Sequence, residues 1–357
     1  MYSNQLAQTN RQSSGTLRGP AAAWEAMPSH SIRDRQLAGV RIVVTGGAGF
    51  VGGNVTAALL LSGADVKVID DLSTGRIERL ARARTLGFSD GDLCVADVRS
   101  YDCAEAIRGW QPQVLVHLAG QSSLPSAIRS PLRDADINIR GSVNVLEACR
   151  AVGVERVVYA ASAAIYGQVP AEQLPVTEGT LIAPSSPYGL SKATALRYLE
   201  LFHRDHGLPY VALAISNVYG PGQTAPACGV IPQLVRDFVD GRPIRITGDG
   251  QQTRDFVHVG DVADAVVLAC WADCVGLVNI ASGRETSVAE VVEQVCRITG
   301  TQVARQFVPA VFGEARRMVM DAGRAHRVLG WQSRVLLADG IAEVVADVQR
   351  RRAEVAG

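Results

Sequence analysis

The sequence predicts an α/β protein built on a doubly wound parallel sheet, followed by a smaller C-terminal domain. Short β-branched runs alternate with helical segments from Val40 to about Ser216, as in a parallel sheet with helices on both faces. The first run leads directly into a stretch of glycines, which is typical of a strand–turn–helix unit. From about Asn217 the alternation loosens into loops, a helix over 230–240 and short strands such as 243–247, which indicates the second domain.

The first strand–helix–strand unit follows the N-terminal region abruptly. The run RIVVT over 41–45 is predicted as a strand, and 54–63 as an apolar helix that Gly63 ends. The run VKVID over 66–70 is predicted as the second buried strand. Because a helix joins the two strands, they are expected to lie parallel.

The same alternation continues along the chain, with about six strands in all. Each strand is a short apolar run, and the longer helices end at glycines. The further strands are predicted over 93–98, 114–120, 156–162 and 210–216, and the further helices over 103–110, 131–153 and 190–207.

Composition excludes several classes of protein. The 357 residues carry 35 basic and 35 acidic side chains, which argues against a nucleic-acid or anionic-membrane binder, because such proteins need a basic surplus. No apolar stretch reaches ~18 residues, so no membrane span is expected. The start lacks the features of a secretory signal, and the seven cysteines include no CxxC pair. A cytoplasmic protein with reduced thiols and no bound metal is expected.

The glycine-rich stretch predicts a dinucleotide site. Gly46, Gly49 and Gly52 stand between a predicted strand and a predicted helix. The first glycine permits the tight turn, the second lets the backbone approach a pyrophosphate at the helix N-terminus, and the third allows close packing of helix on sheet. This placement favours a nucleotide loop over an ordinary turn.

Acidic residues at the ends of the next strands indicate which dinucleotide binds. Asp70 ends the second strand, where a carboxylate accepts hydrogen bonds from the adenosine ribose and repels a 2′-phosphate, so NAD is favoured over NADP. Arg76 is the residue that could instead bind such a phosphate. Asp71 is expected to be a solvated neighbour. Asp97 either reaches the adenine edge or caps the helix that begins near Tyr101.

Tyr188 and Lys192 form a YxxxK pair at the start of a predicted helix. The i,i+4 spacing puts both side chains on one helical face. A free tyrosine, with a pKa near ~10, is a poor base at neutral pH, but a nearby ammonium favours the phenolate. Lys192 is one of only two lysines in the chain, and Ser162 ends the strand upstream. The three residues are predicted to be catalytic.

These motifs together resemble the extended short-chain dehydrogenase/reductases of the NAD-dependent nucleotide-sugar epimerase and dehydratase family, most of all the UDP-glucose 4-epimerases. The similarity covers about residues 40–340. The motifs that carry it are TGGAGFVG (45–52), DDLSTG (70–75), HLAGQ (117–121), ASAAIYG (161–167), SPYGLSK (186–192), NVYGPGQ (217–223), GDGQQTRDFVHVGDV (248–262) and GEARRMVMD (313–321).

The resemblance implies a role for many residues of this chain. Tyr188 is the implied base, Lys192 binds the nicotinamide ribose, and Ser162 hydrogen-bonds the reacting hydroxyl. The expected NAD contacts are Gly46, Gly49, Phe50, Val51, Gly52, Asp70, Asp71, Ser73, Thr74, Gly75, Asp97, Val98, Leu118, Ala119, Gly120, Tyr188 and Lys192. The expected substrate contacts are Ser162, Tyr188, Asn217, Val230 and Arg254. A homodimer through the helices at 131–153 and 190–207 is also implied.

The predicted domain organisation follows from the texture of the chain and this resemblance. Residues 1–38 are expected to form a disordered extension, because they lack apolar periodicity. Residues 39–216 are expected to form the NAD-binding Rossmann domain, and 217–357 the nucleotide-sugar-binding domain. The segment from about 255 to 282 is expected to pack back on the Rossmann domain.

Two alanines narrow the predicted reaction. Dehydratases and decarboxylases of the group carry an acidic residue at the position of Ala164, and the 3,5-epimerizing relatives carry a cysteine there. Ala163 and Ala164 supply neither acid nor base, which elimination of water requires beside the tyrosine. The expected reaction is therefore oxidation at C4, rotation of the 4-keto sugar and return of the hydride. A nucleotide-sugar reductase, a dehydratase and a non-catalytic nucleotide sensor are the alternatives.

Two departures from the family pattern leave the substrate open. An arginine common before the NVYG motif is Ala214 here, and the segment 309–312 lacks the arginine that grips the nucleotide diphosphate; Arg316 or Arg317 is a candidate to replace it. UDP-glucose or galactose, their N-acetyl forms and UDP-glucuronate are all candidates, in that order. His117, at a strand end, is expected to be a hydrogen-bonded structural histidine under the cofactor.

Overall fold

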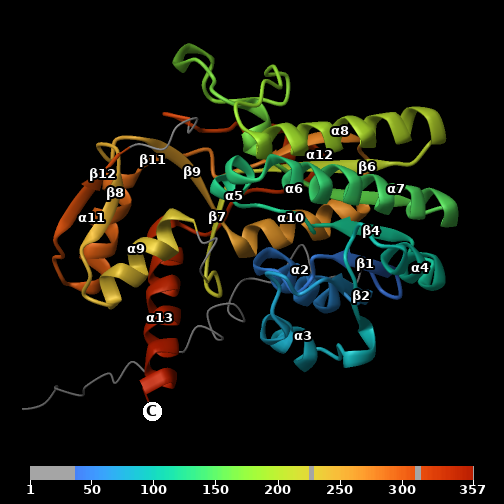
Figure 1. Cartoon of the computed structure of the whole chain (residues 1–357), viewed down its shortest axis with the longest axis horizontal. Coiled ribbons are helices and arrows are strands. Elements are labelled where there is room, and N and C mark those ends of the chain that lie inside the picture. The colour runs from blue at the N-terminus through green and yellow to red at the C-terminus, as the bar shows by residue number, and fades with distance from the viewer. Residues whose placement is uncertain (1–36, 225–228, 310–314, 357) are drawn as a thin grey trace, which may run out of the picture.

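The main feature of the computed structural model, which describes residues 37–224, 229–309 and 315–356, is a parallel sheet of seven strands (Figure 1). All its neighbouring strands are parallel, so the predicted fold class is confirmed. The spatial order is β10 (Gly276–Ile280), β6 (Tyr210–Ile215), β5 (Arg156–Ser162), β4 (Val114–His117), β1 (Arg41–Thr45), β2 (Asp65–Asp70) and β3 (Leu93–Val95).

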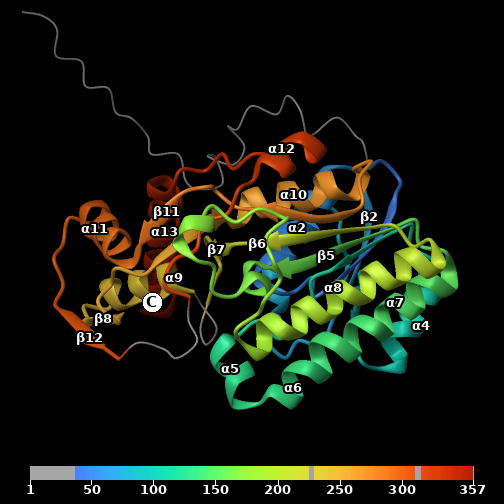
Figure 2. The same cartoon turned by 90° about the horizontal axis from the view of Figure 1, so that it is seen from above.

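Helices cover both faces of this sheet, and each face has its own apolar core (Figure 2). The strand side chains alternate between the two cores, as the period of a β-strand requires. One face carries α2 (Phe50–Leu61), α10 (Val259–Trp271) and α12 (Gly323–Leu329). The other carries α4 (Tyr101–Trp110), α7 (Gly141–Val152) and α8 (Pro187–His206).

Some predicted elements differ from the observed ones at their ends. The strands predicted over 93–98 and 114–120 are shorter, because the chain turns into loops after Val95 and after His117. The helix predicted over 131–153 is divided into α6 (Pro131–Ala135), a π-helical turn η3 (Asp136–Arg140) and α7. Such turns accommodate one extra residue and often occur at functional sites.

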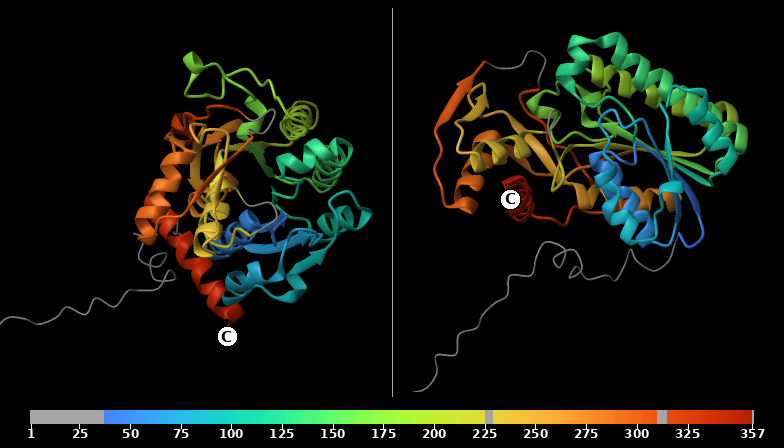
Figure 3. Two further views of the ribbon diagram at one scale, coloured as in Figure 1. Left: turned by 60° about the vertical axis from the view of Figure 1, so that its left-hand side comes forward. Right: turned by 60° about the horizontal axis from the view of Figure 1, so that its bottom comes forward.

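The C-terminal elements form a smaller unit beyond the carboxyl ends of the main strands (Figure 3). The strand β7 (Asn217–Tyr219) follows β6 almost directly, so the chain enters this unit from the carboxyl end of β6. A third apolar core binds its elements together. They are β7, β9 (Thr253–His258) and β11 (Glu285–Ser287) in one sheet, β8 (Ile244–Thr247) and β12 (Arg305–Val308) in another, and the helices α9 (Val230–Val239), α11 (Val288–Thr299) and α13 (Leu337–Ala356).

The chain returns from this unit to the main sheet between β9 and β11. The helix α10 packs on α2, and β10 forms the seventh strand beside β6. The remaining short elements are η1 (Ile77–Leu80), α3 (Ala81–Thr85), η2 (Asp90–Asp92), α5 (Leu124–Arg129), η4 (Ala163–Tyr166) and η5 (Ala171–Gln173).

Membrane spans, metal-ligand clusters and the N-terminal extension were also considered in the sequence. Within the described ranges, no helix has both the length and the apolar character needed to cross a bilayer. The same ranges hold no group of three or more metal-ligating side chains. Nearly all of the extension predicted over 1–38 lies outside the described residues.

Candidate active site

The glycine-rich loop connects β1 to α2 with very little space to spare. Gly46 has a φ of +74°, and a Cβ there would lie 2.6 Å from the Ala119 nitrogen. A Cβ on Gly52 would lie 2.0 Å from the Gly46 oxygen, so the helix approaches the loop as closely as only glycine permits. Gly49 is the N-cap of α2 and no side chain caps that end. The N–H groups of the first turn, at Phe50 and Val51, are thus available to an anion.

Asp70 fixes this loop to the end of β2. Its buried carboxylate accepts a hydrogen bond from the Ala48 nitrogen at 2.9 Å and another from the Leu72 nitrogen at 2.9 Å. Burial raises the pKa of Asp70, and the two backbone N–H groups oppose that shift. Gly75 packs against the carboxylate, since a Cβ there would lie 2.4 Å from Oδ1. The position predicted to contact the ribose is therefore rigid.

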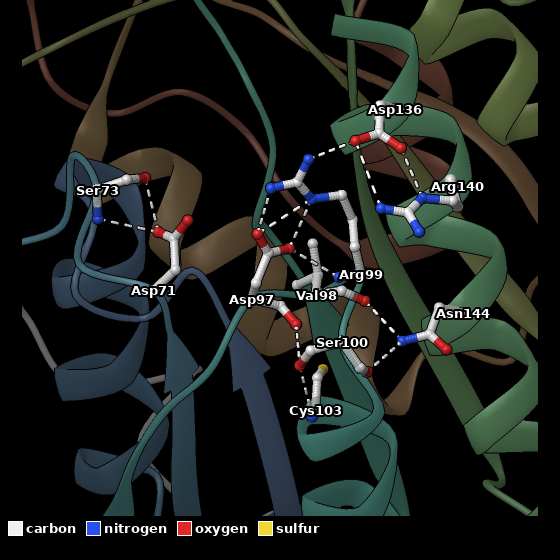
Figure 4. A network of polar contacts seen from close by, with 10 residues as sticks. All are labelled: Asp71, Ser73, Asp97, Val98, Arg99, Ser100, Cys103, Asp136, Arg140 and Asn144. Carbon is white, nitrogen blue, oxygen red and sulfur yellow. Dashed lines mark hydrogen bonds and ion pairs between the residues drawn. The ribbon is translucent and has the colours of Figure 1, made fainter. Parts of the chain in front are cut away.

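The turn after Asp70 is exposed and held by local hydrogen bonds. Asp71 accepts from the Ser73 nitrogen at 3.0 Å and from the Ser73 hydroxyl at 2.7 Å (Figure 4). Arg79 donates to the Thr74 oxygen at 3.1 Å. Arg76, the candidate for binding a 2′-phosphate, is exposed at the start of η1.

Asp97 is held by an arginine and does not cap the following helix. The N-cap of α4 is Ser100, whose hydroxyl accepts from the Cys103 nitrogen at 3.1 Å, so the alternative interpretation of Asp97 as an N-cap is wrong. The Asp97 carboxylate accepts from the Arg99 Nε at 2.9 Å, and Arg99 also pairs with Asp136 on η3 (Figure 4). Hydrogen bonding with Arg99 lowers the pKa of Asp97. The helix begins at Tyr101, two residues before the range predicted for it, and its cap lies three residues after Asp97.

Val98 contacts α7, and the segment after β4 contacts η3 and α8. The Val98 oxygen accepts from the Asn144 side chain at 2.7 Å, which ties this strand end to α7 (Figure 4). Leu118, Ala119 and Gly120 follow β4 directly. A Cβ on Gly120 would lie 3.4 Å from the Lys192 Nζ, so the segment predicted to contact NAD is packed against the predicted catalytic lysine.

Tyr188 and Lys192 lie in the first two turns of α8. Ser186 caps the helix by accepting from the Gly189 nitrogen at 3.1 Å, and Pro187 occupies its first position. Lys192 is buried, and its Nζ donates to the Ala160 oxygen at 2.9 Å. Burial lowers the pKa of Lys192 to about 8. The helix start therefore places a lysine of unusually low pKa one turn from the tyrosine.

Ser162 meets Tyr188 at the end of β5. The Ser162 hydroxyl accepts from the Ala164 nitrogen at 3.2 Å, which caps η4. Burial raises the pKa of Tyr188, and a hydrogen bond with the Ser162 side chain opposes the shift. The three residues predicted to be catalytic thus come from one strand end and one helix start, and the structure brings them together.

Ala163 and Ala164, which narrow the predicted reaction, begin η4 next to Ser162. Ala163 is buried in the apolar core, and Ala164 lies in η4 directly after Ser162. A Cβ on Gly189 would lie 2.4 Å from the Ala164 oxygen, so η4 contacts the turn of α8 that carries Tyr188.

His117 is hydrogen-bonded through both ring nitrogens, as predicted. Nδ1 lies 2.7 Å from the Thr45 hydroxyl and Nε2 lies 3.0 Å from the Ser142 hydroxyl. Ser142 donates its own proton to the Asn138 oxygen at 2.5 Å, which assigns the ring proton to Nε2. Burial lowers the pKa of His117 to about 3, so the ring is neutral and structural.

Three of the residues predicted to contact the substrate lie in the smaller unit, whereas Ser162 and Tyr188 lie in the larger one. Asn217 lies on β7, which runs parallel to β9 and pairs Asn217 with Phe256, two residues from Arg254. Arg254 is buried, and its Nη1 donates to the Thr253 oxygen at 2.6 Å. Val230 begins α9, whose N-terminus has no side-chain cap.

Arg316 and Arg317, the candidates to replace the diphosphate-binding arginine of the family, are both bound to carboxylates. Arg316 forms a bidentate pair with Asp249 at 2.7 and 2.8 Å. Arg317 forms a bidentate pair with Glu285 at 2.7 and 2.6 Å. Ala214 is buried within β6, and the segment 310–314 lies outside the described residues.

Three polar residues of the site were not predicted. Asn138 and Asp134 are buried under α8, and Gln121 joins them after β4. Their signal in the sequence is the i,i+4 spacing of Asp134 and Asn138 within a helix whose other face carries apolar residues. A polar pair on a buried helix face needs partners, and those partners are known only once the fold is known.

The residues present fit a bound NAD. The uncapped start of α2 offers backbone donors to a pyrophosphate, and the glycine contacts leave no room for side chains in the loop. The rigid carboxylate of Asp70 lies at the end of β2, where the ribose of a dinucleotide binds in this fold. The buried Lys192, predicted to bind the nicotinamide ribose, is packed against Gly120.

Comparisons with known proteins agree with this arrangement. Residues 42–281 match the model of the NAD-dependent epimerase/dehydratase family. The UDP-glucose 4-epimerase of Mycolicibacterium smegmatis is 37% identical over 310 residues, which cover 86% of this chain and 97% of that protein.

Two solved structures have the same fold over nearly their whole length. The UDP-glucose 4-epimerase of Thermotoga maritima, solved with UDP-glucose, is 33% identical with a TM-score of 0.82, covering 88% of this chain and 100% of that one. The UDP-glucose 4-epimerase of Thermus thermophilus, solved with NAD, is 33% identical with a TM-score of 0.81, covering 87% and 99%. The resemblance and the NAD cofactor predicted from the sequence are confirmed. The chain belongs to the NAD-dependent epimerase/dehydratase family and is an NAD-dependent enzyme.

Proposed function

We propose that the protein is a UDP-sugar 4-epimerase that oxidises C4, lets the 4-keto sugar rotate, and reduces it from the other face. The observation that carries this proposal is the meeting of Ser162, Tyr188 and Lys192 beside two alanines, Ala163 and Ala164. The similar proteins named above are UDP-glucose 4-epimerases, which favours a UDP-hexose as substrate.

Proton transfer at C4 is the task of the three catalytic side chains. Tyr188 accepts the proton of the C4 hydroxyl as a phenolate, and Ser162 hydrogen-bonds the same oxygen. Lys192 favours the phenolate through its ammonium charge. Bound NAD, its nicotinamide ribose held by Lys192, would supply the acceptance and return of the C4 hydride. On return, Tyr188 gives its proton back to the C4 oxygen.

The apolar side chain of Ala164, at the position where relatives that eliminate water carry an acid, favours epimerisation over elimination. Loss of water across C5 and C6 requires a second acid–base pair close to Tyr188. Ala164 occupies the position from which such a group would act, and Ala163 is packed in the core. The keto sugar therefore retains its C6 oxygen.

We assign the remaining roles in line with the family. The NAD contacts are Gly46, Gly49, Phe50, Val51, Gly52, Asp70, Asp71, Ser73, Thr74, Gly75, Asp97, Val98, Leu118, Ala119, Gly120, Tyr188 and Lys192. Asn217, Val230 and Arg254 bind the nucleotide diphosphate side of the substrate. The uncapped N-terminus of α9 at Val230 supports this assignment, because a phosphate is stabilised there.

We also propose a cytoplasmic homodimer. Leu132 on α6 is 84% exposed and Leu190 on α8 is 58% exposed, although α6 and α8 pack against each other. Two large apolar side chains on adjacent helices favour a partner surface there, which a second copy of this chain supplies by pairing the same helices. The six cysteines of the described residues are free thiols, as is usual in the cytoplasm.

The test is a panel of UDP-, dTDP- and GDP-sugars incubated with the purified enzyme and followed by NMR at C4. Inversion at C4 of a UDP-hexose, without added NAD or NADH, is the expected result. Stoichiometric consumption of added NADH or NADPH would instead identify a reductase.

A further inference from the structure

A buried carboxylate lies beneath the catalytic helix. Asp134, on α6, is 1% exposed. Its Oδ1 accepts from the Gln121 Nε2 at 2.8 Å and from the Asn138 Nδ2 at 3.2 Å. Its Oδ2 has no hydrogen-bond partner among the described residues. A half-satisfied buried carboxylate is costly, so a role that repays this cost is expected.

Hydrogen bonds and packing connect Asp134 to the catalytic residues. The Asn138 Nδ2 also donates to the Ser191 hydroxyl at 3.0 Å, and that hydroxyl donates to the backbone carbonyl oxygen of Tyr188 at 3.0 Å. A Cβ on Gly120 would lie 2.8 Å from the Asn138 Oδ1 and 3.4 Å from the Lys192 Nζ. Asp134, Asn138 and Lys192 therefore belong to one buried cluster between α6 and α8.

Lys192 needs a counter-charge in this setting. It is 4% exposed, and burial lowers its pKa to about 8, while the charge of Asp134 acts in the opposite direction. An ammonium without such a neighbour loses its proton more easily in a buried site.

Apart from Tyr188, whose phenolate Lys192 is proposed to favour, two further titratable groups lie near Lys192, and neither carries a negative charge at neutral pH. His117 is neutral, because burial lowers its pKa to about 3. The Tyr159 ring centroid lies 4.9 Å from the Lys192 Nζ, and burial raises the pKa of Tyr159 well above its ordinary value. The remaining charged side chains of these elements are Arg129 on α5, Arg133 on α6, Asp136 and Arg140 on η3, and Arg197, Glu200, Arg204 and Asp205 on α8.

We propose that Asp134 is a positioning residue for the reaction, whose buried charge keeps Lys192 in the ammonium form that Tyr188 requires. This assignment rests on the proposed 4-epimerase function only for its meaning in catalysis. The electrostatic action of Asp134 on Lys192 is a property of the folded chain.

The proposal has a distinctive pH signature. Asp134→Asn keeps an oxygen that accepts from Gln121 and Asn138, but it removes the charge. Loss of that charge lowers the pKa of Lys192 and also that of Tyr188, because Asp134 raises both. The alkaline limb of kcat/KM, where Lys192 loses its proton, therefore moves to lower pH. A merely structural role would lower the rate at every pH and leave the limb in place.

The chain offers an unusually direct readout, because Lys67 and Lys192 are its only lysines. Lysine-selective ¹³Cε labelling of the holoenzyme gives two side-chain signals, which Lys67→Arg assigns. The titration midpoint of the Lys192 signal is then measured in the unmutated enzyme, in Asp134→Asn and in Glu200→Gln. The last variant is the matched control, because it removes an exposed carboxylate two turns further along α8.

A midpoint lower by roughly one pH unit in Asp134→Asn, with none in Glu200→Gln, is the expected result. An unchanged midpoint in a folded Asp134→Asn protein would overturn the proposal. Asp134→Ser, which also removes the charge and admits water, gives the same comparison if the Asn variant does not fold. A lowered midpoint in an enzyme that inverts no sugar at C4 would contradict the proposed function and leave the action of Asp134 on Lys192 supported.

Discussion

Asp70 combines a structural and a binding task in one carboxylate. Its two oxygens hold Ala48 in the glycine loop and Leu72 in the following turn. Each carboxylate oxygen has a second lone pair, so the same group can also accept from ribose hydroxyls. We expect the same charge to repel a 2′-phosphate and so to favour NAD over NADP.

The first prediction concerns that preference. Asp70→Ala should weaken NAD binding roughly 10- to 100-fold, as expected for the loss of hydrogen bonds to a charged group, and it should reduce discrimination against NADP. Titration calorimetry of the cofactor-free enzyme with each dinucleotide measures both effects. Equal affinity of the unmutated protein for NAD and NADP would contradict the role of Asp70.

His117 makes stability depend on pH. The folded-state pKa of His117 is about 3, whereas an unfolded histidine titrates near ~6.5, so only the unfolded chain binds a proton between these values. The contribution of His117 is complete above pH ~6.5 and is lost as the pH falls toward 3.

The second prediction follows from this linkage. Between pH 7 and pH 5 the unmutated protein should lose about 2 kcal/mol of unfolding free energy through His117. His117→Gln should lack that part of the loss, while His206→Gln, at an exposed position on α8, should retain it. Urea unfolding at the two pH values measures the difference. The same pH dependence in all three proteins would show that His117 is not the group responsible.

For single residues, local motifs can be predicted from the sequence more easily than contacts between distant segments. Tyr188 and Lys192 stand four residues apart, so one helix brings them together and the pair is predictable. Asp134 and Gln121 meet only because α6 packs on α8 and the segment after β4 reaches them. Asp97 was wrongly considered as an N-cap because an aspartate suits a helix start. In the structure its carboxylate binds Arg99 instead.

Among the secondary-structure elements, apolar runs and glycine stops predict most strands and helices closely. The strands at 41–45 and 156–162 occur as predicted. The π-helical turn at 136–140 was not predicted, because an inserted residue leaves the helical periodicity almost intact. The pairing of β10 with β6 depends on contacts between residues distant in sequence, which no local pattern reveals.

We expect the short helix η4 to determine which reaction follows oxidation. It begins at Ala163, is capped by Ser162, contacts α8 near Tyr188 and carries Ala164. The third prediction is that no 4-keto-6-deoxy sugar forms from any UDP- or dTDP-sugar, because η4 supplies no acid or base. Mass spectrometry of the products would detect the loss of one water. Accumulation of that species would mean that the assigned reaction class is wrong.

For the molecule as a whole, the two units meet where the main strands end. The larger unit holds the proposed catalytic residues and the glycine loop, while β7, β9 and α9 hold the predicted substrate contacts Asn217, Arg254 and Val230. Because α10 and β10 return to the main sheet, the smaller unit is connected to it by several chain segments.

The fourth prediction concerns the proposed dimer. Leu132→Asp, at a position 84% exposed in the single chain, should convert the dimer to a monomer, because a buried unpaired charge is unfavourable at an interface. Leu336→Asp is the control, since that leucine is 53% exposed in the smaller unit. Sedimentation equilibrium measures the mass. A monomeric unmutated protein, or a dimer that tolerates Leu132→Asp, would contradict this interface.

Tyr188 is proposed to move the proton at C4, and Tyr188→Phe tests this role most directly. The substitution keeps the ring and its packing but removes the group that accepts the proton. Turnover on the UDP-sugar found active, followed by NMR at C4, should fall by at least 10²- to 10⁴-fold, which is the typical contribution of a general base. The fold, by circular dichroism, and the NAD content should persist. Near-normal turnover of a folded, NAD-loaded Tyr188→Phe enzyme would contradict the account.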